Sequence, residues 1–461
     1  MSNSTLLSGL IVLTILVADL GLFTIGDAAI LAILVSVAFR HLAVYMLILV
    51  GTLQDTPGLA GGWWYVGFVG VGCVVIAHAR FTDANVQRKN WTAELTLLVF
   101  ALGVVAYATL ISFFSDSWLD LEQSPDRPFY FAGGLIAFNI VCAYCSFQLL
   151  YNADQRPSML RIPLTIILLH MMFAAFVQAL IDPSFLASAV SSIDFETTGQ
   201  LATVTALGFT RITGTYATPN GFALVSVLLL LLWLSSYRFQ RVPLLFVPVF
   251  IAIALLISVL SLSKAMLAFA ALCSAIMLLF VGLRNAFSRI FAVLLVGFSV
   301  FLLSDIIFNR MVLDSFRIGA LDWDANTYRN IAWRAVIDNF TQSHWFLGTG
   351  LSHWPVFFER TVGFKLSDPH TWIFSYLGTY GILGLVFFTF ILWRLLSTYF
   401  LHGAAGKALM LCLLMLLLIK DAVSIPYLLG NTPLTWFIWV LIFSVCSVRP
   451  GSRSVHGAKS V

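Results

Sequence analysis

Apolar runs long enough to cross a membrane recur along the whole of this 461-residue chain. Many of them are about 20 residues long, which is the length that a helix needs to cross a hydrocarbon core of roughly 30 Å. Only 10% of the residues are charged, whereas a soluble domain typically carries about 25%. The sequence therefore predicts an all-α, polytopic membrane protein, with residues 1–461 forming a single transmembrane domain.

Hydropathy predicts about 12 to 14 transmembrane helices, because some of the candidate spans are short. The run at the start of the chain lacks the basic segment and the cleavage pattern of a signal peptide, so we interpret it as a retained first span. The candidate spans are residues 6–24, 28–39, 42–53, 62–79, 93–114, 130–151, 162–181, 221–236, 242–260, 264–282, 288–306, 373–396, 406–420 and 433–447.

The loops between these spans predict how the chain is oriented. Loops rich in Lys and Arg, such as residues 80–90 and 153–161, alternate with loops that are not basic, and short basic loops stay in the cytoplasm. Both termini are then cytoplasmic, and the two long loops at residues 182–220 and 308–372 are external. The net charge of +4 is spread over the cytoplasmic loops, so it reports topology and predicts no nucleic-acid partner.

The first of these external loops ends in the stretch FTRITGTYATPNGFA, residues 209–223. Arg211 stands there among small polar residues, directly before a long apolar run, and we expect Asn220 to cap the helix that follows. A guanidinium, the Thr213 hydroxyl and a helix start together suit an anion, above all phosphate. The alternative is an arginine that extends its side chain to the lipid head groups.

A second cation is predicted at a similar depth. The stretch SVLSLSKAML, residues 258–267, joins two apolar spans through almost no loop and leaves Lys264 and Ser263 at the outer boundary. A lysine in so tight an external turn departs from the positive-inside trend, and such a departure indicates a functional site. A lysine that only terminates a span is the alternative.

The long loop at residues 308–372 carries the remaining candidates. Apolar residues at nearly helical spacing predict an amphipathic helix over residues 327–340, with Arg329 and Arg334 on it. His370 stands where the loop re-enters the membrane, and a neutral imidazole with an ordinary pKa near 6.5 can take a proton from an incoming hydroxyl. A lone histidine is more often structural, but its place at the boundary favours His370 over the other histidines of the loop.

Divalent-metal chemistry has one candidate site, formed by Asp322 and Asp324. Two carboxylates without a third ligand are a weak signal, because Mg²⁺ sites commonly add substrate phosphates to one or two carboxylates. We favour a solvated acidic turn at this place, and we predict neither a metal nor another cofactor.

Several of these stretches together resemble the O-antigen ligase and polymerase superfamily of bacterial envelope glycosyltransferases. The similarity covers roughly residues 205–390 and rests on the order of four motifs: RITGTYATPNGFA, SLSKA, R-x-x-x-W with GTGLS, and DPHTW leading into YGILG. The resemblance implies a helical fold of the GT-C type in the bacterial inner membrane, with the active site facing the periplasm. It also implies transfer of a glycan from a polyprenyl-pyrophosphate carrier to an acceptor hydroxyl.

The resemblance also implies roles for individual residues. Arg211 and Lys264 correspond to residues that bind the pyrophosphate, Arg329 assists them, and His370 activates or orients the acceptor. The family usually carries Arg where this chain has Lys264, and lysine offers a point charge in place of a bidentate fork. Thr213, Asn220, Ser263 and Arg334 complete the predicted substrate-binding set.

Three functions stay open at this point. We favour a polymerase of O-antigen or exopolysaccharide repeat units, with a lipid-linked glycan donor, a glycan or lipid-linked acceptor and membrane lipids as partners. A ligase that attaches glycan to lipid A-core is the first alternative. A polysaccharide or lipid-linked sugar transporter is the second, although transporters tend to place charge at the membrane midplane and this chain gathers its charge at the outer boundary.

Overall fold

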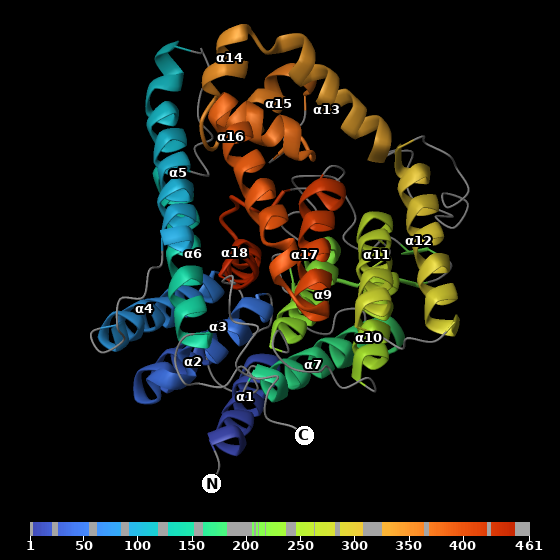
Figure 1. The fold of residues 1–461 in the computed structure, drawn as a ribbon. Helices are drawn as coiled ribbons and strands as arrows, with labels where there is room; N and C mark the ends of the chain where they lie inside the picture. Colours follow the sequence, from blue (N-terminus) through green and yellow to red (C-terminus); the bar gives the residue numbers. More distant parts are fainter. Residues whose placement is uncertain are drawn as a thin grey trace.

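The computed structural model describes the protein as a bundle of helices (Figure 1). The residues that it describes are 3–20, 26–54, 62–83, 92–118, 128–151, 160–181, 205–206, 209–210, 212–216, 218–236, 246–261, 263–281, 286–307, 325–363, 368–421 and 426–447. Within them, the two strands are β1 (Thr205–Ala206) and β2 (Phe209–Thr210), which form one short antiparallel pair.

Each predicted span coincides with a helix, so the prediction of a polytopic helical membrane protein is confirmed. These helices are α1 (Asn3–Leu20), α2 (Asp27–Ala38), α3 (Ala43–Thr52), α4 (Trp63–Asp83), α5 (Thr92–Trp118), α6 (Phe129–Tyr151), α7 (Arg161–Leu180), α9 (Pro219–Ser235), α10 (Phe246–Leu260), α11 (Lys264–Phe280), α12 (Ala286–Ile307), α16 (Trp372–Ser397), α17 (Ala404–Met415) with the π-helical turn η6 (Leu416–Lys420), and α18 (Pro433–Cys446).

Four of the described helices have both the length and the hydropathy to cross a membrane, namely α5, α6, α7 and α16. The other apolar helices are shorter, and α2 and α3 have only 12 and 10 residues. At a rise of 1.5 Å per residue these two reach about 18 and 15 Å, so neither crosses a hydrocarbon core alone. The outward side chains of α12 are large and apolar, with Val293, Leu294 and Val300 between 60% and 67% exposed, which is the surface that lipid requires.

Two helices form the centre of the bundle. Every residue of α18 is buried, and so is every residue of α9 apart from Asn220. α9 packs against α7, α10, α11, α17 and α18, so it links the N-terminal helices to the C-terminal ones. The segment that enters α9 is therefore anchored in the middle of the molecule.

The long loop between α12 and α16 folds into helices of its own, at the end of the molecule opposite α1 (Figure 1). They are α13 (Ala325–Asn339), α14 (Gln342–Leu347) and α15 (Trp354–Val362). α13 confirms the helix predicted over residues 327–340, and its buried face matches the apolar pattern in part. Val336 and Phe340 are buried, together with the small residues Ala332 and Ala335, in an apolar cluster with aromatic side chains of α15. Ile331 and Ile337 are exposed.

Candidate functional site

The residues predicted from the sequence fall at three places: the turn before α9, the start of α11 and the start of α16. Arg211 lies outside the described residues. Lys264 and Arg329 lie in α11 and α13, where the structure describes their backbone but not their side chains. Arg334 lies on the exposed face of α13.

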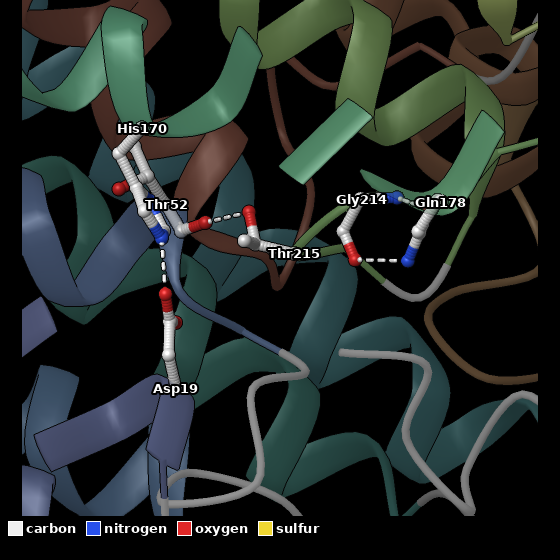
Figure 2. Close-up of polar contacts among 6 residues, drawn as sticks. All are labelled: Asp19, Thr52, His170, Gln178, Gly214 and Thr215. Carbon is white, nitrogen blue, oxygen red and sulfur yellow. Dashed lines mark hydrogen bonds and ion pairs between the residues drawn. The ribbon is translucent and has the colours of Figure 1, made fainter. Parts of the chain in front are cut away.

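The turn before α9 comprises residues 212–216 and is held by side chains from the N-terminal half of the chain (Figure 2). Gln178 of α7 accepts hydrogen bonds from the backbone N–H of Thr213 at 3.2 Å and of Gly214 at 2.8 Å, and its amide group donates to the Gly214 carbonyl at 3.2 Å. The Thr215 hydroxyl donates to the Thr52 carbonyl of α3 at 2.5 Å. The backbone N–H groups of Thr213 and Gly214 and the hydroxyl of Thr215 thus bind other parts of the protein.

Glycine is required at position 214. Its backbone has a φ of +60°, a left-handed conformation that a side chain disfavours. A Cβ atom there would also collide with the ring of Phe222 in α9. The turn therefore packs directly on the first part of the central helix.

The cap of α9 differs from our prediction. Thr218 is the N-cap residue, and its hydroxyl accepts a hydrogen bond from the backbone N–H of Gly221 at 3.1 Å. Pro219 follows as the first helical residue, the position that proline prefers, and this places Asn220 inside the first turn. The prediction that Asn220 caps the helix is wrong.

The start of α11 lies beside the turn. The backbone N–H of Ile212 donates to the Leu260 carbonyl at 3.4 Å, at the end of α10. Ser263 caps α11, with its hydroxyl accepting from the Met266 N–H at 3.4 Å, and Lys264 is the first helical residue. The positive end of a 17-residue helix thus begins close to the segment that carries Arg211, which suits an anion.

His370 has an unusual backbone conformation just before α16. Its φ of +57° is rare for a residue with a side chain. Its backbone N–H donates to Oδ1 of Asp368 at 2.7 Å. The carbonyl of Pro369, between them, accepts from the indole of Trp333 in α13 at 2.8 Å. A carboxylate and the long loop together hold the histidine in this conformation.

The Asp368 carboxyl has a perturbed acidity. Burial raises its pKa to about 7, and the nearby negative charge of Asp421 also raises it, while the hydrogen bond from the His370 backbone opposes the shift. Near neutral pH this carboxyl is therefore a candidate acid or base beside His370.

A buried ion pair that was not predicted from the sequence lies next to the start of α16. Nζ of Lys420 and Oδ1 of Asp421 are 3.0 Å apart, and both side chains are buried. The Asp421 carbonyl accepts from the backbone N–H of Trp372, the first residue of α16, at 2.9 Å, and the ammonium group lies 4.3 Å from the centre of the Tyr427 ring. The sequence could have indicated this pair, because Lys420 and Asp421 are two charged residues inside the apolar run LLLIKDAV. Ionisable residues at membrane depth are by default functional candidates.

Helix packing links the two parts of the candidate site indirectly. The turn contacts the end of α10, α10 packs against α11, and α11 packs against both α17 and η6, which ends at Lys420. The structure therefore connects the predicted motifs through neighbouring elements.

The motif GTGLS has a structural role in this arrangement. The backbone N–H groups of Thr349 and Gly350 donate to the carbonyls of Gly378 and Thr379 at 2.7 and 3.0 Å. These carbonyls directly precede a sharp kink of α16 at Gly381, where φ is +62°. The motif thus supplies partners for the backbone of the helix that begins after His370.

A second buried pair connects α1 and α7. Nε2 of His170 and Oδ2 of Asp19 are 2.6 Å apart (Figure 2). This contact was not predicted either, because the two residues are far apart in the sequence. It fixes the helix that carries Gln178.

The described part of the chain contains no group of three or more His, Cys, Asp and Glu residues that could hold a metal ion. Asp322 and Asp324 lie outside the described residues. That the protein works without a metal therefore stays a prediction.

Comparison with known proteins supports one family. Residues 249–389 match the family model described as O-Antigen ligase. The matched region contains Ser263, Lys264, Arg329, Arg334 and His370 but not the turn before α9. No curated protein matches the chain. The predicted resemblance is confirmed: this polytopic membrane protein carries, at residues 249–389, a domain of the glycan-handling O-antigen ligase and polymerase superfamily.

Proposed function

We propose that the protein is a membrane glycosyltransferase that transfers a glycan from a polyprenyl-pyrophosphate carrier to a sugar hydroxyl, and that it polymerises O-antigen or exopolysaccharide repeat units. The reaction takes place at the periplasmic face of the bacterial inner membrane. The observation that carries the proposal is the conformation of His370, which Asp368 holds and which lies within the region that matches the family. Strained backbone of this kind concentrates at functional sites.

In this reaction the acceptor oxygen bonds to the anomeric carbon of the donor glycan. The bond from that carbon to the pyrophosphate breaks, and the carrier leaves with the bonding electron pair. The hydroxyl proton passes to the His370 imidazole, which contributes general-base catalysis of about 10²- to 10⁴-fold. Asp368 holds the backbone of His370 during this step.

The leaving pyrophosphate gains negative charge, so fixed positive charge beside it stabilises the transition state. Arg211 and Lys264 supply that charge, and the N-terminus of α11, capped by Ser263, adds its dipole. Arg329 and Arg334 of the long loop bind the glycan or the phosphates. Because the protein's own cations neutralise the pyrophosphate, the reaction uses no metal.

Thr213 and Asn220 have smaller parts. Thr213 follows Arg211 by two residues, and Asn220 lies in the first turn of α9. Both contribute hydrogen bonds to the donor.

A ligase that transfers the glycan to lipid A-core is the second candidate, because the matching family model is described as O-Antigen ligase. Deletion of the gene followed by glycan profiling separates the two. Loss of a polymerase leaves single repeat units on the acceptor, whereas loss of a ligase leaves none. Carrier-linked units trapped in the cytoplasm would instead indicate a transporter and would refute both proposals.

A further inference from the structure

Gln178 lies near the end of α7, in the N-terminal half of the chain and outside the region that matches the family. Its side chain is only 2% exposed. It contacts the backbone of a turn more than 30 residues away through the three hydrogen bonds described above, and Figure 2 shows it beside Gly214 of that turn. A buried amide that binds both N–H and C=O groups of one turn specifies the conformation of that turn.

Four of the five backbone N–H groups of the turn donate to other groups of the protein. The N–H of Ile212 binds the end of α10, those of Thr213 and Gly214 bind Gln178, and that of Tyr216 binds the Thr213 carbonyl at 3.1 Å. These four N–H groups are therefore already occupied and do not form the anion site. Arg211 directly precedes the turn, and its guanidinium is therefore the group that we expect to bind a phosphate at this place.

We propose that Gln178 is a positioning residue for donor binding: it fixes the turn at residues 212–216 and thereby the point from which Arg211 extends to the pyrophosphate. This inference rests on the proposed function, because it takes Arg211 as a ligand of the donor. Gln178 does not touch the donor and acts only through the turn.

Glutamine suits this task because one amide group supplies both an acceptor and a donor. A methionine at position 178 has a similar length but leaves two N–H groups and one carbonyl of the turn without that partner. Each buried polar group left unsatisfied costs about 1 to 3 kcal/mol. The turn in such a variant adopts other conformations, so the backbone that directly follows Arg211 in the chain is no longer fixed.

A double-mutant cycle tests the proposal. The variants are Gln178→Met, Arg211→Ala and their combination, and the readouts are kcat and the KM for a polyprenyl-pyrophosphate-linked repeat unit. Gln178→Met should raise this KM about tenfold in the wild-type background, in line with the coupling between residues that share one network. In the Arg211→Ala background the same change should raise it less than about twofold, because the residue that it positions is gone.

Asn139 offers a matched control. Its amide is also 2% exposed and donates to the Thr432 carbonyl at 3.0 Å, but it holds the start of α18. Asn139→Leu should lower the thermal stability about as much as Gln178→Met and leave the donor KM unchanged. If Gln178→Met does not fold, Thr215→Val, which removes only the hydrogen bond to Thr52, takes its place in the cycle and should show the same dependence on Arg211.

An equal rise of the donor KM in both backgrounds would overturn the inference, since Gln178 would then support the fold alone. A donor KM and kcat that Arg211→Ala leaves unchanged would instead remove Arg211 from donor binding and so overturn that part of the proposed function. A smaller effect of Gln178→Met in the Arg211→Ala background supports both the positioning role of Gln178 and the binding of the donor by Arg211.

Discussion

Asp368 is the most informative residue to change, because the structure gives it a contact with the backbone of His370. Its Oδ1 atom accepts a 2.7 Å hydrogen bond from the His370 N–H, where φ is +57°. Asparagine keeps an oxygen at this position, whereas alanine removes it. We therefore predict that Asp368→Asn retains activity within about tenfold and that Asp368→Ala loses more.

The size of the loss follows from the hydrogen bond. A hydrogen bond to a charged group is worth about 1.5 to 3 kcal/mol, and each 1.36 kcal/mol is a factor of about ten in rate. If that free energy holds His370 in its reactive conformation, Asp368→Ala should lower kcat about ten- to a hundredfold. The assay is chain elongation by the detergent-purified protein with a lipid-linked donor, and Asp338→Asn, an exposed carboxyl on α13, is the control.

The pH at which the variants are compared matters. With a pKa of about 7, the Asp368 carboxyl is about 90% protonated at pH 6 and about 90% ionised at pH 8. Asparagine resembles the protonated form, so the variant and the wild type should behave alike at pH 6. Parity at pH 6 combined with a loss of about 10²- to 10⁴-fold at pH 8 would make Asp368 itself the base and would refute the role assigned to His370.

The same carboxyl makes stability depend on pH. The folded protein binds its proton up to about pH 7, whereas the unfolded chain releases it near pH 3.9. The folded state thus binds more protons between these values, and the contribution of Asp368 to stability falls as the pH rises from about 4 to about 7. Thermal unfolding of Asp368→Asn should lack this fall, and identical pH profiles for the two proteins would contradict the burial of the carboxyl.

Four further results are expected. Lys264→Arg should keep donor turnover, since it restores the residue that the family usually carries, and a large loss would argue against phosphate binding there. Lys420→Met should lower the unfolding free energy by about 3 to 5 kcal/mol, because it leaves a buried charge unpaired, and Asp421→Asn in the same chain should recover most of this loss in chemical unfolding. Excess chelator should leave the purified enzyme active, and activity restored by Mg²⁺ would reverse our view of the metal. A reporter fused after Arg360 should score as external, and a cytoplasmic score would exclude the proposed site.

The helices could be predicted from the sequence because a membrane imposes a simple rule. Each spanning segment must be apolar and must satisfy its own backbone hydrogen bonds, so hydropathy alone located the apolar helices, although only four of those described are long enough to cross a membrane by themselves. The buried face of α13 could be predicted only in part. Val336 and Phe340 of the apolar pattern are buried, but Ala332 and Ala335 are buried beside them, and a pattern of large apolar residues does not identify such small residues.

The candidate site could be predicted only in part. Charges are rare in this chain, so Lys264 and His370 were conspicuous, whereas Gln178 is one uncharged residue among many. Its partners lie 35 and 36 residues away along the chain, and only the packing of α7 against α9 brings them together. The N-cap of α9, by contrast, could have been predicted from the sequence. Thr218 precedes a proline, and proline prefers the first helical position after the cap.

The contact between Asp421 and the start of α16 depends on a π-helical turn, which hydropathy does not detect. The helix α17 ends in one π-helical turn, in which the backbone N–H of Asp421 donates to the Leu416 carbonyl at 3.0 Å, five residues earlier. Such a turn holds one extra residue, which rotates the following side chains by about 100° relative to a regular helix. Because of this rotation the Asp421 carbonyl reaches the first N–H of α16, at Trp372, a group that has no partner within its own helix. The π turn therefore fixes the start of α16, and His370 is held two residues before it.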